Sequence, residues 1–314
     1  SHLVDLLLQK GFKVRVIDDL SGGRLENLKH HKKNKNFFFK KLDINKMSLK
    51  EKIFKNASYI FHLAGKGDIV PSIENPLNYM MTNVIGTTKV LENCRYQKIK
   101  KFVYAASSSC YGLASTPTNE KHKISPEYPY ALSKFIGEET CFHWSKVYNI
   151  PMVSIRIFNA YGPRVKTTGV YGAVFGVFFK QKLENKPLTL VGNGLQRRDF
   201  LNVKDVANAF YMSAISKKKN EIYNLGSGKP KKIIDLIKLL GSNKIVKLPK
   251  RPGEPDCTWA DTKKIKKQIK WKPKISFKNG VNEMLSNIEN WKNAPLWNKK
   301  NIKKATKTWF KYLS

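Results

Sequence analysis

Short apolar runs alternate with amphipathic stretches over the first half of this 314-residue chain, and this alternation restricts the fold more than any other feature. β-Branched and aromatic residues predict five strands, at residues 13–18, 37–43, 59–64, 101–107 and 151–158. Helical patterns lie between them, near residues 76–98 and 129–148. Near-continuous apolar strands that alternate with helices indicate an α/β fold, a parallel sheet covered on both faces. Such a sheet binds ligands at the carboxyl ends of its strands.

The second half of the chain is organised differently. Its pattern predicts three helices and one strand, in chain order at residues 172–184, 203–215, 221–225 (the strand) and 231–240. Turn signals such as VGNG and RPGEP separate these elements. We therefore expect a sheet domain at residues 1–158, a smaller lobe over its carboxyl edge at 159–285, partly interleaved with it, and a basic, aromatic tail at 286–314.

The formal net charge of +36 raises the question of a nucleic-acid partner. Only eight of the 59 basic residues are arginine, the residue that most often reads phosphates and base edges. The lysines are spread along the whole chain rather than gathered in one segment. This distribution favours a lysine-rich surface, and we expect no nucleic-acid partner.

Other composition features bear on location and metals. No apolar run approaches the roughly 20 residues of a membrane-spanning helix, and residues 1–9 lack the features of a signal peptide. The four cysteines form no CxxC pair, and the six histidines have no metal-binding spacing. We therefore expect a reducing, cytoplasmic setting and no metal.

The start of the chain predicts a helix followed by a strand. SHLVDLLLQ is amphipathic, Gly11 suits a helix C-terminus, and the strand KVRVID ends at Asp18. In a dinucleotide-binding fold, the acid that ends the second strand binds the adenosine ribose and follows the phosphate-binding glycines by roughly 20 residues. We therefore expect the first strand and its glycine loop to precede residue 1.

The stretch PYALSK places Tyr130 and Lys134 four positions apart, on one face of a helix. A nearby ammonium stabilises phenolate, so we expect Lys134 to lower the pKa of Tyr130 toward neutrality. Tyr130 would then serve as a general base for an alcohol. Upstream, the strand that ends in AASSS places Ser107 at the ligand-binding edge, where its hydroxyl can share a proton with Tyr130.

The chain resembles the extended short-chain dehydrogenase/reductase family, and specifically its NAD-dependent sugar-nucleotide epimerases and dehydratases such as UDP-glucose 4-epimerase. The resemblance covers residues 1 to about 285 and rests on an ordered set of motifs. These are VIDDLSGGRLENL (16–28), LDI (42–44), HLAG (62–65), TNVIGT (82–87), AASSSCYG (105–112), SPEYPYALSK (125–134), FNAYGPR (158–164), VGNGLQRRDFLNVKDVA (191–207), NLGSG (224–228) and RPGEP…WAD (251–261).

The resemblance implies a Rossmann-type doubly wound sheet, NAD as cofactor and a nucleotide-sugar substrate. It implies a catalytic trio of Ser107, Tyr130 and Lys134. The residues that it implies around the cofactor are Asp18, Asp43, Ile44, Ala64, Gly65, Asn83, Tyr130 and Lys134. The residues that it implies around the substrate are Ser107, Ser108, Phe158, Asn159, Arg198, Arg251 and Thr258, with Asn159 and the two arginines on the diphosphate.

Three reactions share this scaffold: 4-epimerisation, 4,6-dehydration and decarboxylation. In the family, a dehydratase carries an Asp–Glu pair directly after the catalytic serine or threonine, where this chain has Ser108 and Ser109. A serine hydroxyl is too weak an acid and base for the elimination. We therefore expect a 4-epimerase acting on UDP-glucose/galactose or UDP-GlcNAc/GalNAc. In the family, members that accept N-acetylated sugars tend to have a small residue directly before the Trp of the WAD element, and Thr258 at this position favours the N-acetylated sugars.

Two alternatives stay open: a 4,6-dehydratase of the dTDP-glucose type, and a catalytically inactive relative that binds nucleotide, RNA or a membrane. Gly67 and Asp68 stand where some relatives carry a phosphate-binding lysine. We expect His62 to be a packed strand residue, and the tail to dock on its own domain or on a dimer mate rather than lie on an anionic membrane. The resemblance also implies a homodimer through a four-helix bundle, built from residues 76–98 and 129–148, and a role in surface-polysaccharide precursor supply.

Overall fold

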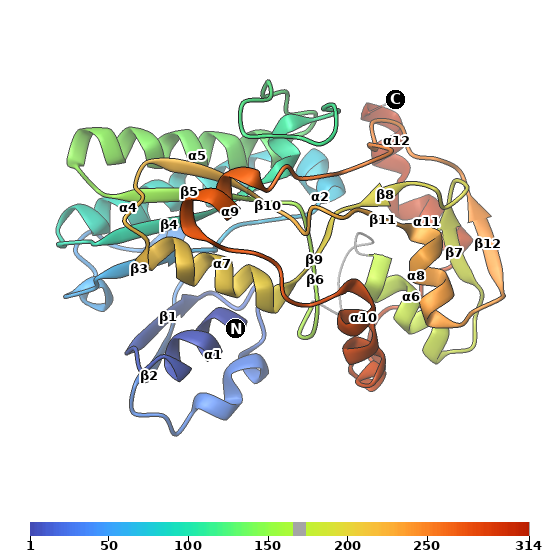
Figure 1. The fold of residues 1–314 in the computed structure, drawn as a ribbon, viewed down its shortest axis with the longest axis horizontal. Helices are drawn as coiled ribbons and strands as arrows, with labels where there is room; N and C mark the ends of the chain where they lie inside the picture. Colours follow the sequence, from blue (N-terminus) through green and yellow to red (C-terminus); the bar gives the residue numbers. More distant parts are fainter. Residues whose placement is uncertain (166–173, 314) are drawn as a thin grey trace.

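The computed structural model describes residues 1–165 and 174–313. Four parallel strands form its main sheet, in the order β10-β5-β4-β3 (Figure 1). They are β3 (Tyr59–His62), β4 (Lys101–Ser107), β5 (Met152–Ile157) and β10 (Glu221–Leu225). Three come from the first half of the chain as predicted, whereas β10 returns from beyond residue 220 to extend the sheet past β5.

A second parallel pair joins β1 (Val14–Asp18) and β2 (Phe37–Lys41), with Val14 opposite Phe37. Figure 1 shows this pair set apart from the main sheet, next to α1 (His2–Gln9). The strand predicted at residues 37–43 ends two residues early because Asp43 caps the short turn that follows it.

Helices cover both faces of the main sheet, so the predicted Rossmann-type doubly wound α/β fold is confirmed. Buried residues of α4 (Thr87–Arg95) and α5 (Pro129–Tyr148) pack on one face, and those of α7 (Val203–Ile215) and α9 (Lys263–Ile269) on the other. Gly137 lets α5 approach the sheet, because a Cβ there would lie 2.4 Å from the Tyr104 hydroxyl.

The helix predicted at residues 76–98 is built from three consecutive parts. These are α3 (Pro76–Met80), a π-helical stretch at Met81–Gly86, and α4. A short helix, α2 (Ile69–Glu74), precedes them.

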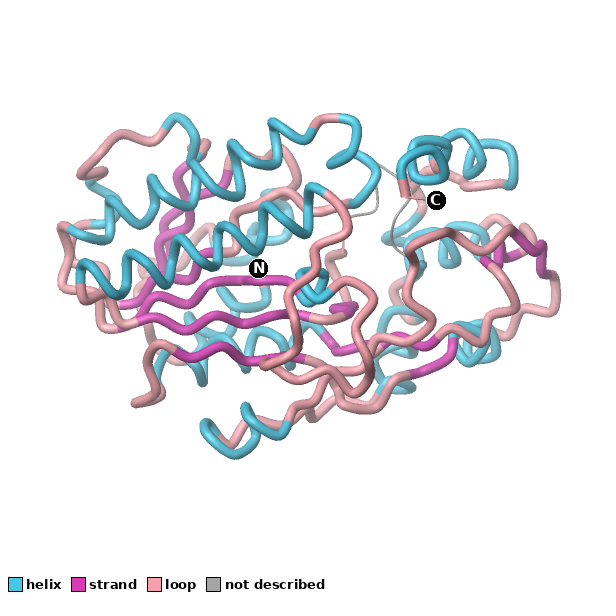
Figure 2. The backbone as a smooth tube through the Cα atoms, turned by 90° about the horizontal axis from the view of Figure 1, so that it is seen from above, coloured by secondary structure: helices cyan, strands magenta, loops and turns pink. Residues whose placement is uncertain are grey.

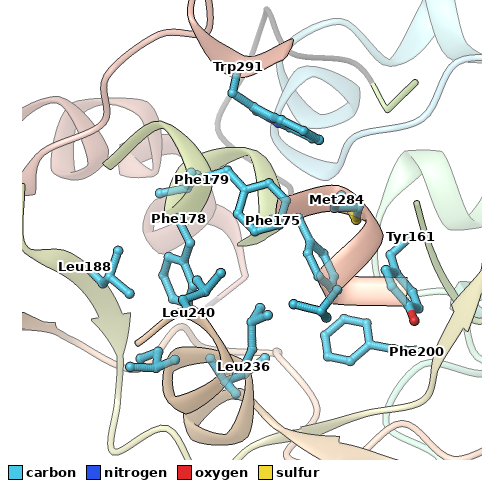
Figure 3. Close-up of a cluster of buried hydrophobic side chains, with 14 of the residues drawn as sticks. Tyr161, Phe175, Phe178, Phe179, Leu188, Phe200, Leu236, Leu240, Met284 and Trp291 are labelled. Atoms are coloured by element: carbon cyan, nitrogen blue, oxygen red, sulfur yellow. The ribbon is translucent and has the colours of Figure 1, made fainter. Parts of the chain in front are cut away.

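The smaller lobe has a core of its own, which Figure 3 shows in close-up. Its core helices are α6 (Val174–Leu183), α8 (Ile233–Leu240) and α10 (Phe277–Leu285). Three two-stranded pairs complete it: β7 (Leu188–Val191) with β12 (Ile245–Leu248), β6 (Asn159–Tyr161) with β9 (Phe200–Asn202), and β8 (Arg197–Arg198) with β11 (Lys231–Lys232). The first two residues of the helix predicted at 172–184 lie outside the described part of the chain.

The basic, aromatic tail folds back onto the lobe. It contains a 3-10 turn at Ile288–Trp291 and two short helices, α11 (Lys299–Ala305) and α12 (Lys307–Tyr312). Figure 2 shows helical segments next to the C-terminus. Trp291 is 1% exposed and meets Phe179 of α6 edge to face, with ring centroids 4.7 Å apart. The expectation that the tail docks on its own protein is therefore confirmed. Among the described residues, no helix has the length and apolar character needed to span a bilayer.

Candidate active site

The carboxyl end of β4 brings Ser107 and Tyr130 together. The Ser107 hydroxyl is hydrogen-bonded to the Tyr130 hydroxyl, and its oxygen lies 2.8 Å from the Ser109 hydroxyl oxygen. The Tyr128 ring stacks on the Tyr130 ring, with a centroid distance of 6.3 Å. Pro129 begins α5 one residue before Tyr130, where a missing N–H costs nothing.

The prediction that Lys134 lowers the pKa of Tyr130 is wrong for the protein as it stands. Burial raises the pKa of Tyr130, the hydrogen bond with Ser107 opposes this, and the carboxylate of Asp68 raises it further. The Lys134 ammonium instead lies over the ring of Tyr104, 4.3 Å from its centroid. Burial of the Tyr130 phenol therefore raises its pKa by more than the hydrogen bond with Ser107 lowers it.

Lys134 is itself perturbed. It is 7% exposed, and burial lowers its pKa to about 8. A Cβ on Gly65 would lie 3.6 Å from its ammonium, so the backbone that follows β3 passes directly beside it. The Lys134 side chain therefore extends from α5 to the turn that follows β3, with its ammonium between Gly65 and the Tyr104 ring.

Asn83 ties the turn after β3 to α5. It is fully buried, its side-chain oxygen accepts from the Lys66 N–H at 2.7 Å, and its amide donates to the Lys66 carbonyl and to the Ser133 hydroxyl. Both amide hydrogens are therefore bonded within the protein. A direct contact from Asn83 to a cofactor stays a prediction; its observed contacts hold Gly65 beside Lys134.

The other predicted cofactor residues lie at strand ends. Asp18 ends β1, where its carboxylate accepts the Leu20 N–H at 2.7 Å and lies against Gly23. Asp43 follows β2 and accepts the Asn45 N–H at 2.8 Å, while Ile44 is buried against the helix at Gly86. Ala64 lies just past the end of β3.

The two predicted phosphate ligands of the lobe share one carboxylate. Arg198 donates to Glu254 at 2.7 Å and to the Pro255 carbonyl at 2.8 Å. Arg251 lies 3.9 Å from the other oxygen of Glu254. Two guanidiniums thus converge on one carboxylate. Sequence reasoning missed Glu254.

Thr258 and Asn159 are also brought together. The Thr258 hydroxyl donates to the Asn159 side-chain oxygen at 2.6 Å and accepts the Asp199 N–H at 3.1 Å. Ser108 and Phe158 lie at the ends of β4 and β5, respectively, and both are partly buried. Asp199, which sequence reasoning missed, is fully buried and accepts from the N–H groups of Ser227, Gly228 and Ala260. It therefore joins the NLGSG and WAD motifs, a role that only long-range contacts reveal.

A buried ion pair supports α5 from behind the site. Glu138 is 1% exposed and accepts two bonds from the Arg156 Nε, at 3.0 and 3.1 Å, and one from its Nη2. Glu138 also accepts from Ser154, and Arg156 donates to the Tyr111 hydroxyl at 2.8 Å. Glu138 lies one helical turn after Lys134, so this network fixes the helix that carries Tyr130 and Lys134.

Three of the six histidines bear on the question of a metal or catalytic histidine. His62 is 3% exposed and bonded to the Thr87 hydroxyl at 2.8 Å, and burial lowers its pKa to about 3, as expected for a packed residue. His30 and His31 instead both contact Asp5 Oδ1, at 2.8 and 2.7 Å. This trio could hold a metal ion, a grouping that sequence spacing missed. Arg164, 2.7 Å from Asp5, already balances the carboxylate.

Comparison with known proteins agrees with this geometry. The model of the GDP-mannose 4,6 dehydratase family matches residues 1–284. The chain belongs to this family of NAD-dependent sugar-nucleotide epimerases and dehydratases.

Its relatives carry epimerase names. The UDP-glucuronate 4-epimerase of Thermodesulfobacterium geofontis is 32% identical, over 95% of this chain and 92% of its own length. The crystal structure of Bacillus cereus UDP-glucuronic acid 4-epimerase, with UDP-glucuronic acid and NAD, is 30% identical and superposes with a TM-score of 0.86, covering 92% of this chain and 95% of that one. The structure of UDP-N-acetylglucosamine 4-epimerase from Methanobrevibacter ruminantium M1, in complex with UDP-N-acetylmuramic acid, is 31% identical and has a TM-score of 0.86. The match covers 93% of this chain and 94% of that one.

Proposed function

We propose that the protein is an NAD-dependent 4-epimerase of a nucleotide-diphosphate sugar. The observation that carries this proposal is the hydrogen-bonded Ser107–Tyr130 pair at the carboxyl end of β4, with the buried Lys134 one helical turn away. The names of the relatives support it, because proteins similar over nine-tenths of the chain are called UDP-sugar 4-epimerases.

The residues present fit NAD. Asp18 ends β1 with a carboxylate suited to ribose hydroxyls, and an acid there disfavours the 2′-phosphate of NADP. A Cβ on Gly65 would lie 3.0 Å from the side-chain oxygen of Asn83 and 3.6 Å from the Lys134 ammonium. The absence of a side chain at Gly65 therefore leaves space at the edge of the sheet beside Lys134. Asp18, Asp43, Ile44, Ala64, Gly65 and Lys134 would hold the cofactor. When bound, NAD supplies a reversible acceptor for the hydride of sugar C4.

The chain's own residues handle the proton. Tyr130 takes the proton of the C4 hydroxyl while the Ser107 hydroxyl bonds the same oxygen. Tyr130 returns the proton to that oxygen when the 4-keto sugar is reduced on its other face. In the protein as described, burial and Asp68 keep the pKa of Tyr130 raised. A positive charge brought beside the phenol by the bound cofactor would favour the phenolate.

The lobe recognises the diphosphate. Arg198 and Arg251 converge on Glu254, and planar guanidiniums bind paired phosphate oxygens well. Asn159 is the first residue of β6, and its side-chain amide, held by the Thr258 hydroxyl, adds a polar group beside the diphosphate. Ser108 and Phe158 border the sugar at the strand ends.

The family model that matches the chain carries a dehydratase name, which makes 4,6-dehydration the second candidate. Ser108 and Ser109 oppose it, since neither can exchange protons at C5 and C6 as a carboxyl pair does. The candidate sugar substrates are UDP-glucose, UDP-GlcNAc and UDP-glucuronate. The names of the relatives add UDP-glucuronate, which sequence analysis did not suggest.

We further infer a homodimer formed by the helices at residues 76–95 and 129–148. Leu77, Met81 and Ile85 are spaced four apart and are 71%, 41% and 43% exposed, which makes an apolar stripe on one helix. Leu132 and Val147 on α5 are also exposed. Met81→Lys should convert the dimer to a monomer in light scattering.

A reducing, cytoplasmic location is supported by the four cysteines, which are all free thiols.

The test is direct. Full-length protein is incubated with NAD and, in parallel, UDP-glucose, UDP-GlcNAc, UDP-glucuronate and dTDP-glucose, and the products are followed by mass and proton NMR. A C4 epimer of unchanged mass is expected from one of the UDP-sugars. Tyr130→Phe should abolish its formation, whereas the neighbouring Tyr128→Phe should retain most of it. A product lighter by one water would replace the epimerase with a dehydratase, and bound NAD without turnover of any sugar would favour the inactive relative.

A further inference from the structure

The segment that follows residue 284 lies beyond the family match and reaches back to the site. Its first part is anchored in the lobe: Trp291 lies over Phe179 (Figure 3), and Gln181 of α6 donates to the Trp297 carbonyl at 2.7 Å. Its last part, α12, ends next to the loop at residues 250–254, which carries Arg251. The chain therefore crosses from the lobe core to the predicted phosphate-binding loop.

Trp309 of α12 holds this loop by two contacts. Its indole N–H donates to the Pro252 carbonyl at 2.7 Å, and the Arg251 guanidinium lies 5.4 Å from its ring centroid. Trp309 is 7% exposed, so both contacts are sheltered from water. One residue further along, Gly253 has a φ of +65° and lies against Leu313, which fixes the turn that presents Arg251.

The same helix, α12, also contacts the sheet domain. The Thr308 hydroxyl donates to Glu74, the last residue of α2, at 2.8 Å. α2 begins directly after Asp68, the residue whose carboxylate raises the pKa of Tyr130. One short helix thus joins the loop that carries Arg251 to the segment that borders the catalytic tyrosine.

A cavity of about 810 Å³ opens beside these contacts. It is lined by residues 113–116, which follow the catalytic end of β4, by residues 250–257, and by Phe310 of α12. Arg251 and Glu254 both face it. Phe310 of α12 therefore lines the same cavity as Arg251, the predicted ligand of the diphosphate.

We propose that Trp309 is a positioning residue for nucleotide-sugar binding, which acts by holding Arg251 and its loop in place. The inference rests on the proposed function, because it takes Arg251 as a ligand of the diphosphate. An arginine on a free loop must be ordered when the ligand binds, which weakens binding. The ring of Trp309 beneath the guanidinium and its bond to Pro252 order this arginine in advance.

The experiment measures kcat and KM of the full-length enzyme for its UDP-sugar, together with the Kd of UDP. Trp309→Ala should raise KM and Kd by roughly tenfold, the order expected from losing a cation–π contact and a hydrogen bond, with kcat within about twofold. Trp309→Phe keeps the ring and the fold but loses the N–H, and should restore most of the affinity. Tyr312→Ala removes an exposed ring from the same helix and serves as the matched control.

A double-mutant cycle tests whether Trp309 acts through Arg251. Trp309→Ala added to Arg251→Ala should weaken UDP binding no further, whereas additive losses would overturn the inference. An unchanged KM in both Trp309 variants of an active enzyme would overturn it while leaving the proposed function intact. A wild-type protein that binds no UDP and turns over no sugar would overturn the proposed function, and the role of Trp309 with it.

Discussion

Glu138 on α5 and Arg156 on β5 form an ion pair buried on all sides, with side chains 1% and 3% exposed. Such a pair fixes geometry more than it adds stability, because desolvation offsets much of the attraction. Its position, one turn beyond Lys134, means that the helix carrying Tyr130 is fixed to the sheet by charge as well as by apolar contact.

Glu138→Gln should lower the free energy of unfolding by roughly 3–5 kcal/mol, because Arg156 would keep its charge without a carboxylate in a buried site. Denaturant unfolding measures the change. Glu139→Gln alters the adjacent, exposed residue and should change stability little. Equal effects of the two substitutions would contradict the importance of the buried pair.

Ser107→Ala should lower kcat by roughly a hundredfold, because the hydroxyl that bonds Tyr130 also shares the reacting oxygen. Ser107→Thr keeps the hydroxyl and should recover most of the rate. Steady-state kinetics at saturating sugar provide the measurement. A hydroxyl-free variant with normal kcat would remove Ser107 from the proton-handling pair.

Asp68→Asn should shift the acidic limb of the kcat–pH profile to lower pH. The carboxylate of Asp68 raises the pKa of Tyr130, so its removal lowers the pH at which the phenolate forms. Asp68 has a φ of +74°, a conformation that asparagine tolerates, so the backbone should be kept. Asp19→Asn is the control, and a shift toward higher pH in Asp68→Asn would contradict the assignment.

Lys134→Met should abolish turnover yet raise the melting temperature of the cofactor-free protein near about pH 7. Burial lowers the pKa of Lys134 from 10.5 to about 8, so below that value the folded protein holds an unfavourable buried charge. Between the two pKa values the unfolded chain binds the extra proton, and wild-type stability rises with pH.

The gain from Lys134→Met should therefore shrink between about pH 8 and about pH 10.5, the interval between the folded and unfolded pKa values of Lys134. Its upper limit is roughly 3 kcal/mol, from 1.36 kcal/mol per pKa unit. Lys146→Met on the exposed end of α5 should show no such pH dependence in thermal scans. A constant gain across this range would contradict the buried charge.

Local patterns predicted the elements well, because their causes are local. The helix at 203–215 and the strand at 221–225 have the predicted ends, since periodicity and turn residues set them. The pKa of Tyr130 could not be predicted, because it depends on burial and on Asp68, more than 60 positions away in the sequence. Glu254 was missed for the same reason: nothing in RPGEP shows that Arg198 lies beside it.

The return of β10 to the main sheet has a mechanical consequence. Because β10 pairs with β5 after the chain has already passed through the lobe at β6 to β9, no single linker joins the two parts. A protein cut after residue 158 would leave the edge of β5 without its neighbour, so neither half should be recovered as an independent folding unit.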